Sequence, residues 1–154
     1  MNNKVKDYLK QYNMDTRIIE LEESSATVAL AAKALNCEEA RIAKTLSFKL
    51  KDKNILIVTA GDVKIDNAKY KNEFGEKARM LPSEEVLDII GHPVGGVCPF
   101  AVNKDVSIYL DLSLKRFETV FPACGSNHNA IELTNEELEK VTNYNKWIDV
   151  TKEI

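Results

Sequence analysis

The chain has 154 residues, of which 44% are apolar and 29% are charged, and its formal net charge at pH 7 is −3. These values predict one domain spanning residues 1–154 with its own hydrophobic core, exclude an intrinsically disordered chain, and by themselves argue against a nucleic-acid partner. The apolar run ILIV at 55–58 is too short to cross a bilayer and the N-terminus lacks the apolar stretch of a signal peptide, so we expect a cytoplasmic protein without membrane contact.

The first half of the chain predicts two helices and a hairpin. Apolar spacing predicts a helix over 2–12 and a short strand over 17–21. Ser24 or Ser25 is positioned to cap a helix that runs through TVALAAKAL and ends at Asn36. The apolar runs 45–50 and 55–60, separated by KDKN, indicate two strands of a hairpin.

The second half mixes capped helices with strands. Asp66 predicts the start of a helix that closes at Gly75, and Pro82 precedes one that ends at Gly91. Thr134 and Glu137 have the spacing of a capping box for a further helix. Three strands are expected, at 106–110, 118–123 and 147–150.

This order of elements predicts the fold class. Strands occur in hairpin-like pairs and helices are spaced irregularly between them. A regular doubly wound sheet is therefore disfavoured. We expect an α+β domain with a mixed, partly closed, barrel-like β-sheet flanked by helices.

The stretch GHPVGGVCPF at 91–100 is the most unusual segment. Gly95 and Gly96 free the backbone, while Pro93 and Pro99 stiffen both sides. Such a loop can aim successive backbone N–H groups at an anionic oxygen, although a tight turn that only fills space is an equal alternative from the segment alone.

Reactive side chains are the other interpretation of this loop. Cys98 and His92 could form a nucleophile and base if they touch, but a loop cysteine beside proline is more often an apolar filler. Cys37, Cys98 and Cys124 form no CxxC pair, and the two histidines, His92 and His128, show no zinc-ligand spacing. We therefore expect free thiols, no metal site and no cofactor.

Basic residues are concentrated in one part of the chain. Five basic residues and one acid lie between Arg41 and Lys53, whereas six acids and two bases lie between Asp15 and Ala40. A folded chain could present a basic face on an acidic body. The alternative is a scattered, solvated charged surface.

Five segments together carry a resemblance to a known family. They are TVALAAKAL, RIAKTLSFKL, ILIVTAGD, GHPVGGVCPF and CGSNHNAIELT. In order and spacing the chain resembles the YbaK/EbsC family, free-standing relatives of the editing insertion domain of bacterial prolyl-tRNA synthetase, over nearly its whole length. The resemblance implies that family's fold and the hydrolysis of mischarged aminoacyl-tRNA.

The resemblance also assigns residues. Lys44 matches the family's functional lysine and is expected to hold the 3′ end of the substrate through a phosphate or the ester carbonyl. The family's GxxxP loop corresponds to Gly95, Gly96, Val97, Cys98 and Pro99, whose backbone is expected to cradle the ester, with Cys98 in the pocket wall. Gly125 and Ser126 match a second turn expected to line the same pocket.

Two positions depart from the family pattern. Ala101 stands where many relatives have glycine, and the second turn, CGSNHNA, contains a histidine. The pocket shape can differ accordingly, so alanyl, cysteinyl, seryl, threonyl and prolyl groups all remain candidates.

Three functions follow as hypotheses. The first is a trans-editing deacylase of mischarged tRNA, on substrates such as Cys-tRNA(Pro) or Ala-tRNA(Pro), with the aminoacylated tRNA 3′ acceptor end as partner and prolyl-tRNA synthetase as a candidate partner. The second is a non-catalytic module that binds an aminoacyl or nucleotide ligand. The third is a thiol enzyme dependent on Cys98. The sequence does not indicate the oligomeric state.

Overall fold

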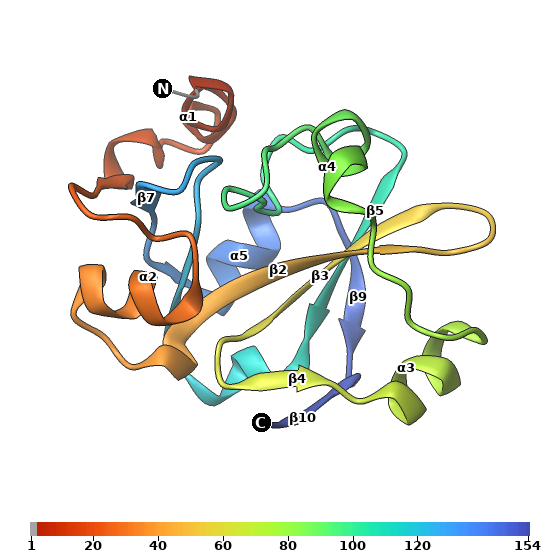
Figure 1. The fold of residues 1–154 in the computed structure, drawn as a ribbon. Coiled ribbons are helices and arrows are strands. Elements are labelled where there is room, and N and C mark those ends of the chain that lie inside the picture. The colour runs from red at the N-terminus through yellow and green to blue at the C-terminus, as the bar shows by residue number, and fades with distance from the viewer. Residues whose placement is uncertain (1–2) are drawn as a thin grey trace.

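The computed structural model describes residues 3–154, which form five α-helices and a set of mostly short strands (Figure 1). The helices are α1 (Asn3–Lys10), α2 (Val28–Leu35), α3 (Asn67–Phe74), α4 (Ser83–Ile90) and α5 (Asn135–Val141). The strands are β1 (Ile19–Glu20), β2 (Ile42–Lys49), β3 (Asn54–Ala60), β4 (Val63–Ile65), β5 (Val106–Asp111), β6 (Thr119–Pro122), β7 (Asn129–Ala130), β8 (Leu133–Thr134), β9 (Tyr144–Ile148) and β10 (Thr151–Glu153). Within residues 3–154 no helix is long and apolar enough to cross a membrane.

Six of the strands form the central sheet, in the order β8-β6-β2-β3-β5-β9. The β2–β3 hairpin is antiparallel, as its two apolar runs predict, and Thr45 lies opposite Val58. β2 is also parallel to β6, and β5 is parallel to both β3 and β9. The sheet is thus mixed and curls on itself, which confirms the predicted α+β fold with a partly closed sheet.

Each face of the sheet has its own apolar core. Leu56 and Val58 pack in a cluster that includes residues of α1, α4 and α5. Ile55 and Ile57, which alternate with them along β3, pack with Tyr70 of α3 on the other face. Alternate residues of β3 therefore belong to different apolar cores.

Helix caps mostly follow the sequence predictions. Asp66 accepts hydrogen bonds from Ala68 N and Lys69 N, and the capping box of Thr134 and Glu137 is complete. The helix ends at Asn36, Gly75 and Gly91 are confirmed, each with a positive φ.

The cap of α2 corrects one prediction. Thr27 is the cap, since its Oγ1 accepts from Leu30 N at 3.2 Å. Ser24 Oγ instead accepts from Ala26 N in the preceding turn. Ser25 pairs through its backbone N with Asn127 O at 2.6 Å. A long-range backbone contact thus moves the helix start beyond both serines.

The strand predictions are wrong mainly at the end of the chain. The predicted strand 147–150 overlaps the end of β9, but Asp149 and Val150 lie between β9 and β10. β10 pairs with β4, and β1 pairs with β7, and none of β4, β7 or β10 was expected. These strands have two or three residues each, so their own residues give too little alternation to identify them.

Candidate functional site

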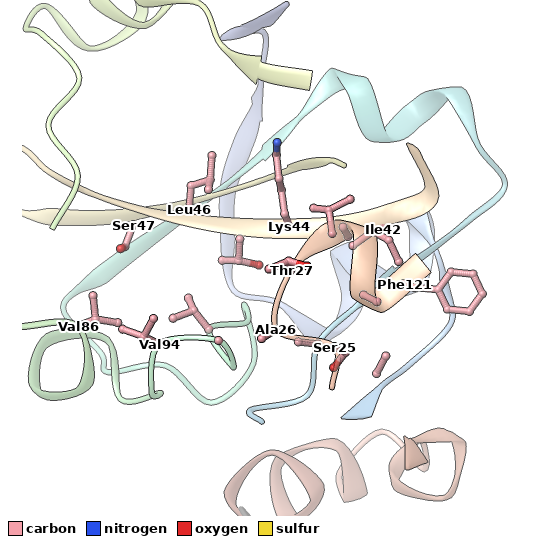
Figure 2. Close-up of a pocket in the computed structure, with 18 of the residues that line it drawn as sticks. Ser25, Ala26, Thr27, Ile42, Lys44, Leu46, Ser47, Val86, Val94 and Phe121 are labelled. Atoms are coloured by element: carbon pink, nitrogen blue, oxygen red, sulfur yellow. The ribbon is translucent and has the colours of Figure 1, made fainter. Parts of the chain in front are cut away.

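A cavity of about 340 Å³ lies between β2, the beginning of α2, the beginning of α4 and the loop that follows α4 (Figure 2). Small residues make up much of its wall: Ala26, Ala31, Ala43, Ala123, Ala130 and Gly95. Val86 and Val94 close it from the side of α4. Because these side chains are small, the space between them can accept a ligand group.

The two faces of β2 contribute differently to this site. Ala43 belongs to the core cluster on the α4 side, whereas Leu46 and Phe48 pack against the cluster on the α3 side. By alternation, Thr45 and Ser47 share the face of Ala43, and Lys44 shares the face of Leu46. Figure 2 shows Ser47 on the side of Val86 and Val94, and Lys44 and Leu46 on the opposite side.

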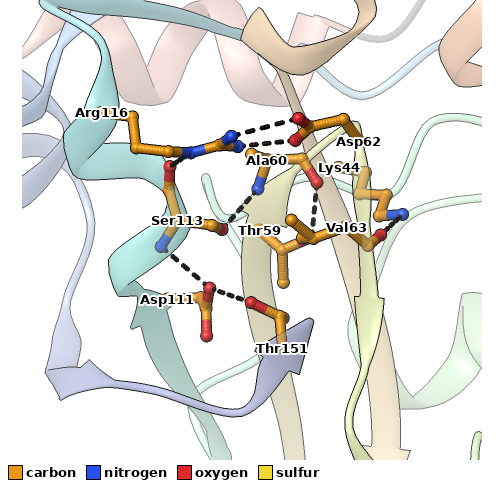
Figure 3. A network of polar contacts seen from close by, with 9 residues as sticks. All are labelled: Lys44, Thr59, Ala60, Asp62, Val63, Asp111, Ser113, Arg116 and Thr151. Carbon is orange, nitrogen blue, oxygen red and sulfur yellow. Dashed lines mark hydrogen bonds and ion pairs between the residues drawn. The ribbon is translucent and has the colours of Figure 1, made fainter. Parts of the chain in front are cut away.

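Lys44 borders the cavity with its stem, while its ammonium group lies beyond the opposite face of β2. Its Nζ donates a hydrogen bond to Val63 O at the start of β4 (Figure 3). Burial lowers the pKa of Lys44, and the nearby carboxylate of Asp62 partly opposes that shift. The expected contact between this ammonium and a bound ester is therefore not preformed.

The groups around Lys44 form a paired polar network. Asp62 binds Arg116 through two contacts of 2.6 and 3.1 Å, and the pKa of Asp62 is held below its usual value first by that bond. Further along, the buried Asp111 accepts hydrogen bonds from Ser113 N, Val150 N and Thr151 Oγ1. The network fixes the turn between β3 and β4 and hence the carbonyl that holds Lys44.

The two glycine turns pack directly against each other. A Cβ added to Gly96 would lie 2.7 Å from Gly125 C and 2.8 Å from Ser126 Cα, so only glycine permits this approach. Gly95 has a φ of +91° and lies beside Ala26 and Asn127. The structure thus brings together the GxxxP loop, the Gly125–Ser126 turn and the segment that precedes α2.

Only part of the predicted loop reaches the cavity. Gly95 and Val97 line it, whereas Gly96 packs against Gly125 and Ser126, and none of these three residues is part of the lining. Pro99 borders a second cavity of about 360 Å³ on the α1 side.

Cys98 does not occupy the predicted place in the pocket wall. It is fully buried in the core cluster and is absent from the cavity lining. The thiol is small and apolar enough to complete the core beneath the loop.

The geometry around Cys98 also disfavours a nucleophile. Burial raises the pKa of this thiol to about 12, and burial lowers the pKa of His92. His92 Nε2 donates to Phe100 O at 2.6 Å, so the nitrogen that lies 3.5 Å from Cys98 Sγ already carries a proton. This histidine cannot remove the thiol proton through that nitrogen, and neither residue reaches solvent.

The side chains of the second turn make hydrogen bonds to neighbouring residues of the same turn. Ser126 Oγ accepts a hydrogen bond from His128 N at 3.1 Å, and the exposed His128 ring contacts Asn127 Oδ1.

Over residues 3–154, no three His, Cys, Asp or Glu side chains gather as a metal site would require.

The basic stretch is partly neutralised by acids from elsewhere in the fold. Arg41 pairs with Glu132 at 3.0 Å and Lys49 lies 3.9 Å from Glu85. Lys53 donates to the hydroxyl of Tyr109. These contacts favour a mixed charged surface over a strong basic face.

Sequence reasoning missed Thr27, Thr45 and Ser47 as parts of the site, although all three line the cavity. Thr45 and Ser47 follow Lys44 at one and three positions, on the other face of the same strand. The signal that could have found them is strand alternation within RIAKTLSFKL, once the side of the strand that faces the loop is known.

Comparisons with known proteins identify the family of this chain. The model of the aminoacyl-tRNA editing domain family matches residues 22–141, which contain every residue named in the cavity wall. A protein of Bacillus subtilis (strain 168), named Uncharacterized protein YwhH, is 53% identical over 150 residues, covering 97% of this chain and 96% of that protein.

The names of two further relatives refer to proline–tRNA ligase or prolyl tRNA synthetase. The proline–tRNA ligase of Bacillus cytotoxicus is 28% identical over 117 residues, which are 75% of this chain but 20% of the ligase. A solved structure, described as a candidate trans-editing enzyme for prolyl tRNA synthetase, superposes with a TM-score of 0.87 at 27% identity, covering 97% of this chain and 96% of that one. From the family match and the 53% identical relative, the chain belongs to the aminoacyl-tRNA editing domain family.

Proposed function

We propose that this chain is a free-standing deacylase that hydrolyses the ester of a mischarged tRNA, with small aminoacyl groups such as those of Cys-tRNA(Pro) or Ala-tRNA(Pro) as substrates. The observation that carries the proposal is the cavity of about 340 Å³, because it combines small apolar walls with a glycine loop and a helix start. A pocket of this size admits a small aminoacyl group.

The proposed chemistry relies on backbone groups. An aminoacyl ester is already activated, so hydrolysis needs a placed water and donors for the developing oxyanion. Gly95 and the first turn of α2, at Thr27 and Val28, border the cavity, and N–H groups at a helix start favour negative charge. The proposal needs neither a side-chain nucleophile nor a cofactor.

Lys44 is proposed to bind the 3′ acceptor end of the tRNA. Its position beyond the opposite face of β2 suits a phosphate contact outside the cavity, and a contact with the ester would require the ammonium to leave Val63 O. The flexible stem of lysine makes either motion available. A prolyl-tRNA synthetase is a candidate partner that would supply further affinity for the tRNA.

The test is deacylation of a panel of mischarged tRNAs by the purified protein, followed by the Lys44→Ala variant. We expect turnover of at least one small aminoacyl group and a roughly hundredfold lower rate for the variant. Lys64→Ala, at an exposed lysine of β4, is the matched control and should keep the full rate. A wild-type rate in Lys44→Ala would mean that Lys44 has no role in the reaction.

One observation favours a second function, a non-catalytic binding module of the same fold. The Lys44 ammonium makes its hydrogen bond to Val63 O rather than to a group in the cavity. Thermal stabilisation by an aminoacyl-adenosine ligand, together with no hydrolysis of any mischarged tRNA, would establish this function instead.

The thiol-enzyme hypothesis has the least support. Because Cys98 is buried and its pKa is raised to about 12, alkylation at neutral pH should modify the partly exposed Cys37 and leave deacylation intact. Mass spectrometry of the alkylated protein, beside its activity, checks this. Loss of activity in step with modification of Cys98 would restore the thiol mechanism.

A further inference from the structure

Two residues that line the cavity carry hydroxyl groups without a hydrogen bond. Among the described residues, Ser25 Oγ and Thr45 Oγ1 are both shielded from solvent and unpartnered, and both residues line the cavity. Buried polar groups in native proteins are nearly always paired, so an unpaired one requires an explanation. Two in one cavity suggest that a ligand supplies the missing partner.

Thr45 has the better placement of the two. It shares the face of β2 with the buried Ala43, opposite the face of Lys44, and its backbone is fixed by pairing with Val58 of β3. A threonine in a central strand has few χ1 rotamers, so its hydroxyl points in a nearly constant direction. Ser25 lies in an irregular segment before α2, where nothing comparable fixes the side chain.

Three other polar side chains of the lining are already engaged, those of Asn129, Thr27 and Lys44. Asn129 bonds both ways with the backbone of Cys124, at 3.1 and 3.2 Å. Thr27 Oγ1 accepts from Leu30 N, and Lys44 Nζ donates to Val63 O. Thr45 is therefore a free hydrogen-bonding group on a fixed strand in a wall that is otherwise largely apolar.

We infer that Thr45 determines specificity by hydrogen bonding to a neutral hydroxyl or thiol on the side chain of the bound aminoacyl group. This inference rests on the proposed function. It selects seryl and cysteinyl groups over alanyl, which has the same shape without the polar atom.

The neutrality of the ligand group follows from the surroundings of Thr45. A charged ammonium in this cavity would lose its hydration and gain only a neutral hydroxyl, which is a net cost. A hydroxyl or thiol can both donate and accept, as Thr45 can, so the bond can form in either direction and gives each group a partner. A site that offers such a bond rejects the analogue that lacks it, because its own polar group then stays unpaired.

The experiment measures binding of two non-hydrolysable ligands, 3′-serylamino-3′-deoxyadenosine and its alanyl counterpart, by calorimetry. Wild type should bind the seryl ligand about tenfold more tightly. Thr45→Val, which keeps the branched shape, should lose that preference, whereas Thr45→Ser should keep it. Equal binding of the two ligands by wild type, or an unchanged preference in Thr45→Val, would overturn the inference.

Thermal unfolding of the free protein gives a second readout. If the hydroxyl of Thr45 only stabilised the strand, the Thr45→Val substitution would lower the Tm. Because Thr45 Oγ1 is unpaired here, Thr45→Val should instead raise the Tm, by about 2–4 °C. A lower Tm would mean that the hydroxyl already has a protein partner, which contradicts the inference.

The same ligands separate this inference from the proposed function. If the seryl preference is present and depends on Thr45 while no mischarged tRNA is hydrolysed, the deacylase proposal fails and the specificity assignment stands. If tRNA is deacylated but Thr45→Val treats seryl and alanyl esters as wild type does, the deacylase stands and the assignment fails.

Discussion

The polar network beside Lys44 and the hydroxyl of Thr45 lie on opposite sides of β2 and differ in how they are hydrogen bonded. On the side of Lys44, Asp62 is paired with Arg116, and the buried Asp111 accepts three hydrogen bonds (Figure 3). On the cavity side, the hydroxyl of Thr45 is buried and makes no bond with any described residue. Paired groups stabilise the fold, and an unpaired group is retained only at a cost in stability.

This difference separates supporting residues from binding residues. The network holds the β3–β4 turn and with it the carbonyl that engages Lys44. The cavity instead has a wall of small residues, and one lining residue, Thr45, has a hydroxyl without a hydrogen bond. Substitutions in the network should therefore lower stability first, whereas Thr45→Val should alter binding first.

The largest expected effect on stability is that of Asp111→Ala. The change leaves Val150 N, Thr151 Oγ1 and Ser113 N without their acceptor, so the free energy of unfolding should fall by about 3 kcal/mol. Urea unfolding measures it, with Asp105→Ala as the control at an exposed carboxylate. A loss no larger than that of the control would mean that the network does not support the fold.

Gly96→Ala should have the next largest effect, on the cavity side. Its new Cβ would meet the backbone of Gly125 and Ser126 at less than 3 Å, so the two turns must separate. We expect a loss of about 2 kcal/mol in stability, together with weaker binding of the aminoacyl ligands above. Unchanged stability and binding would show that the contact between the turns is dispensable.

Arg116→Ala should cost at most about 1 kcal/mol, because both partners of the ion pair are more than a third exposed. The folded pKa of Asp62 is depressed, so the pair contributes above the unfolded value of 3.8 and loses its contribution as the pH falls through the folded pKa. The stability difference between variant and wild type should therefore be present at pH 7, shrink as the pH falls below 3.8, and vanish once the pH is below the depressed folded pKa. A double-mutant cycle with Asp62→Asn isolates the pair, and a difference independent of pH would contradict it.

The smallest expected effect is a gain from Ala101→Gly. Ala101 has a φ of +53°, in the left-handed region that glycine adopts without strain. The relief of strain stabilises the folded chain, whereas glycine raises the entropy of the unfolded chain. The net result should be a free energy of unfolding that is higher by about 0.5 kcal/mol. Ala29→Gly on the exposed side of α2 is the opposite control and should lose about 1 kcal/mol.

Sequence reasoning was most accurate for features that depend on neighbouring residues. Asp66, the Thr134–Glu137 capping box and Gly91 act on backbone groups within about four positions, and all are confirmed. The prediction of the α2 cap was wrong because the backbone N of Ser25 donates to Asn127 O, about a hundred positions away in sequence, and the helix begins after Thr27.

Site residues were harder to assign, because a segment can be functional as a whole while its members have different roles. Gly95 and Val97 do line the cavity, but Cys98 completes the core instead. The proposed roles of Lys44 and of the two turns stay predictions, to be decided by the experiments above.

The sequence by itself determined the α+β class, the caps of most helices and the resemblance to an editing family, since these depend on local hydrogen bonds and on segment order. Only the tertiary structure decided which face of β2 meets the cavity, where the Lys44 ammonium lies and that Cys98 is buried. The physical reason is that alternation divides a strand into two faces, but the elements packed on it determine which face is core and which is site.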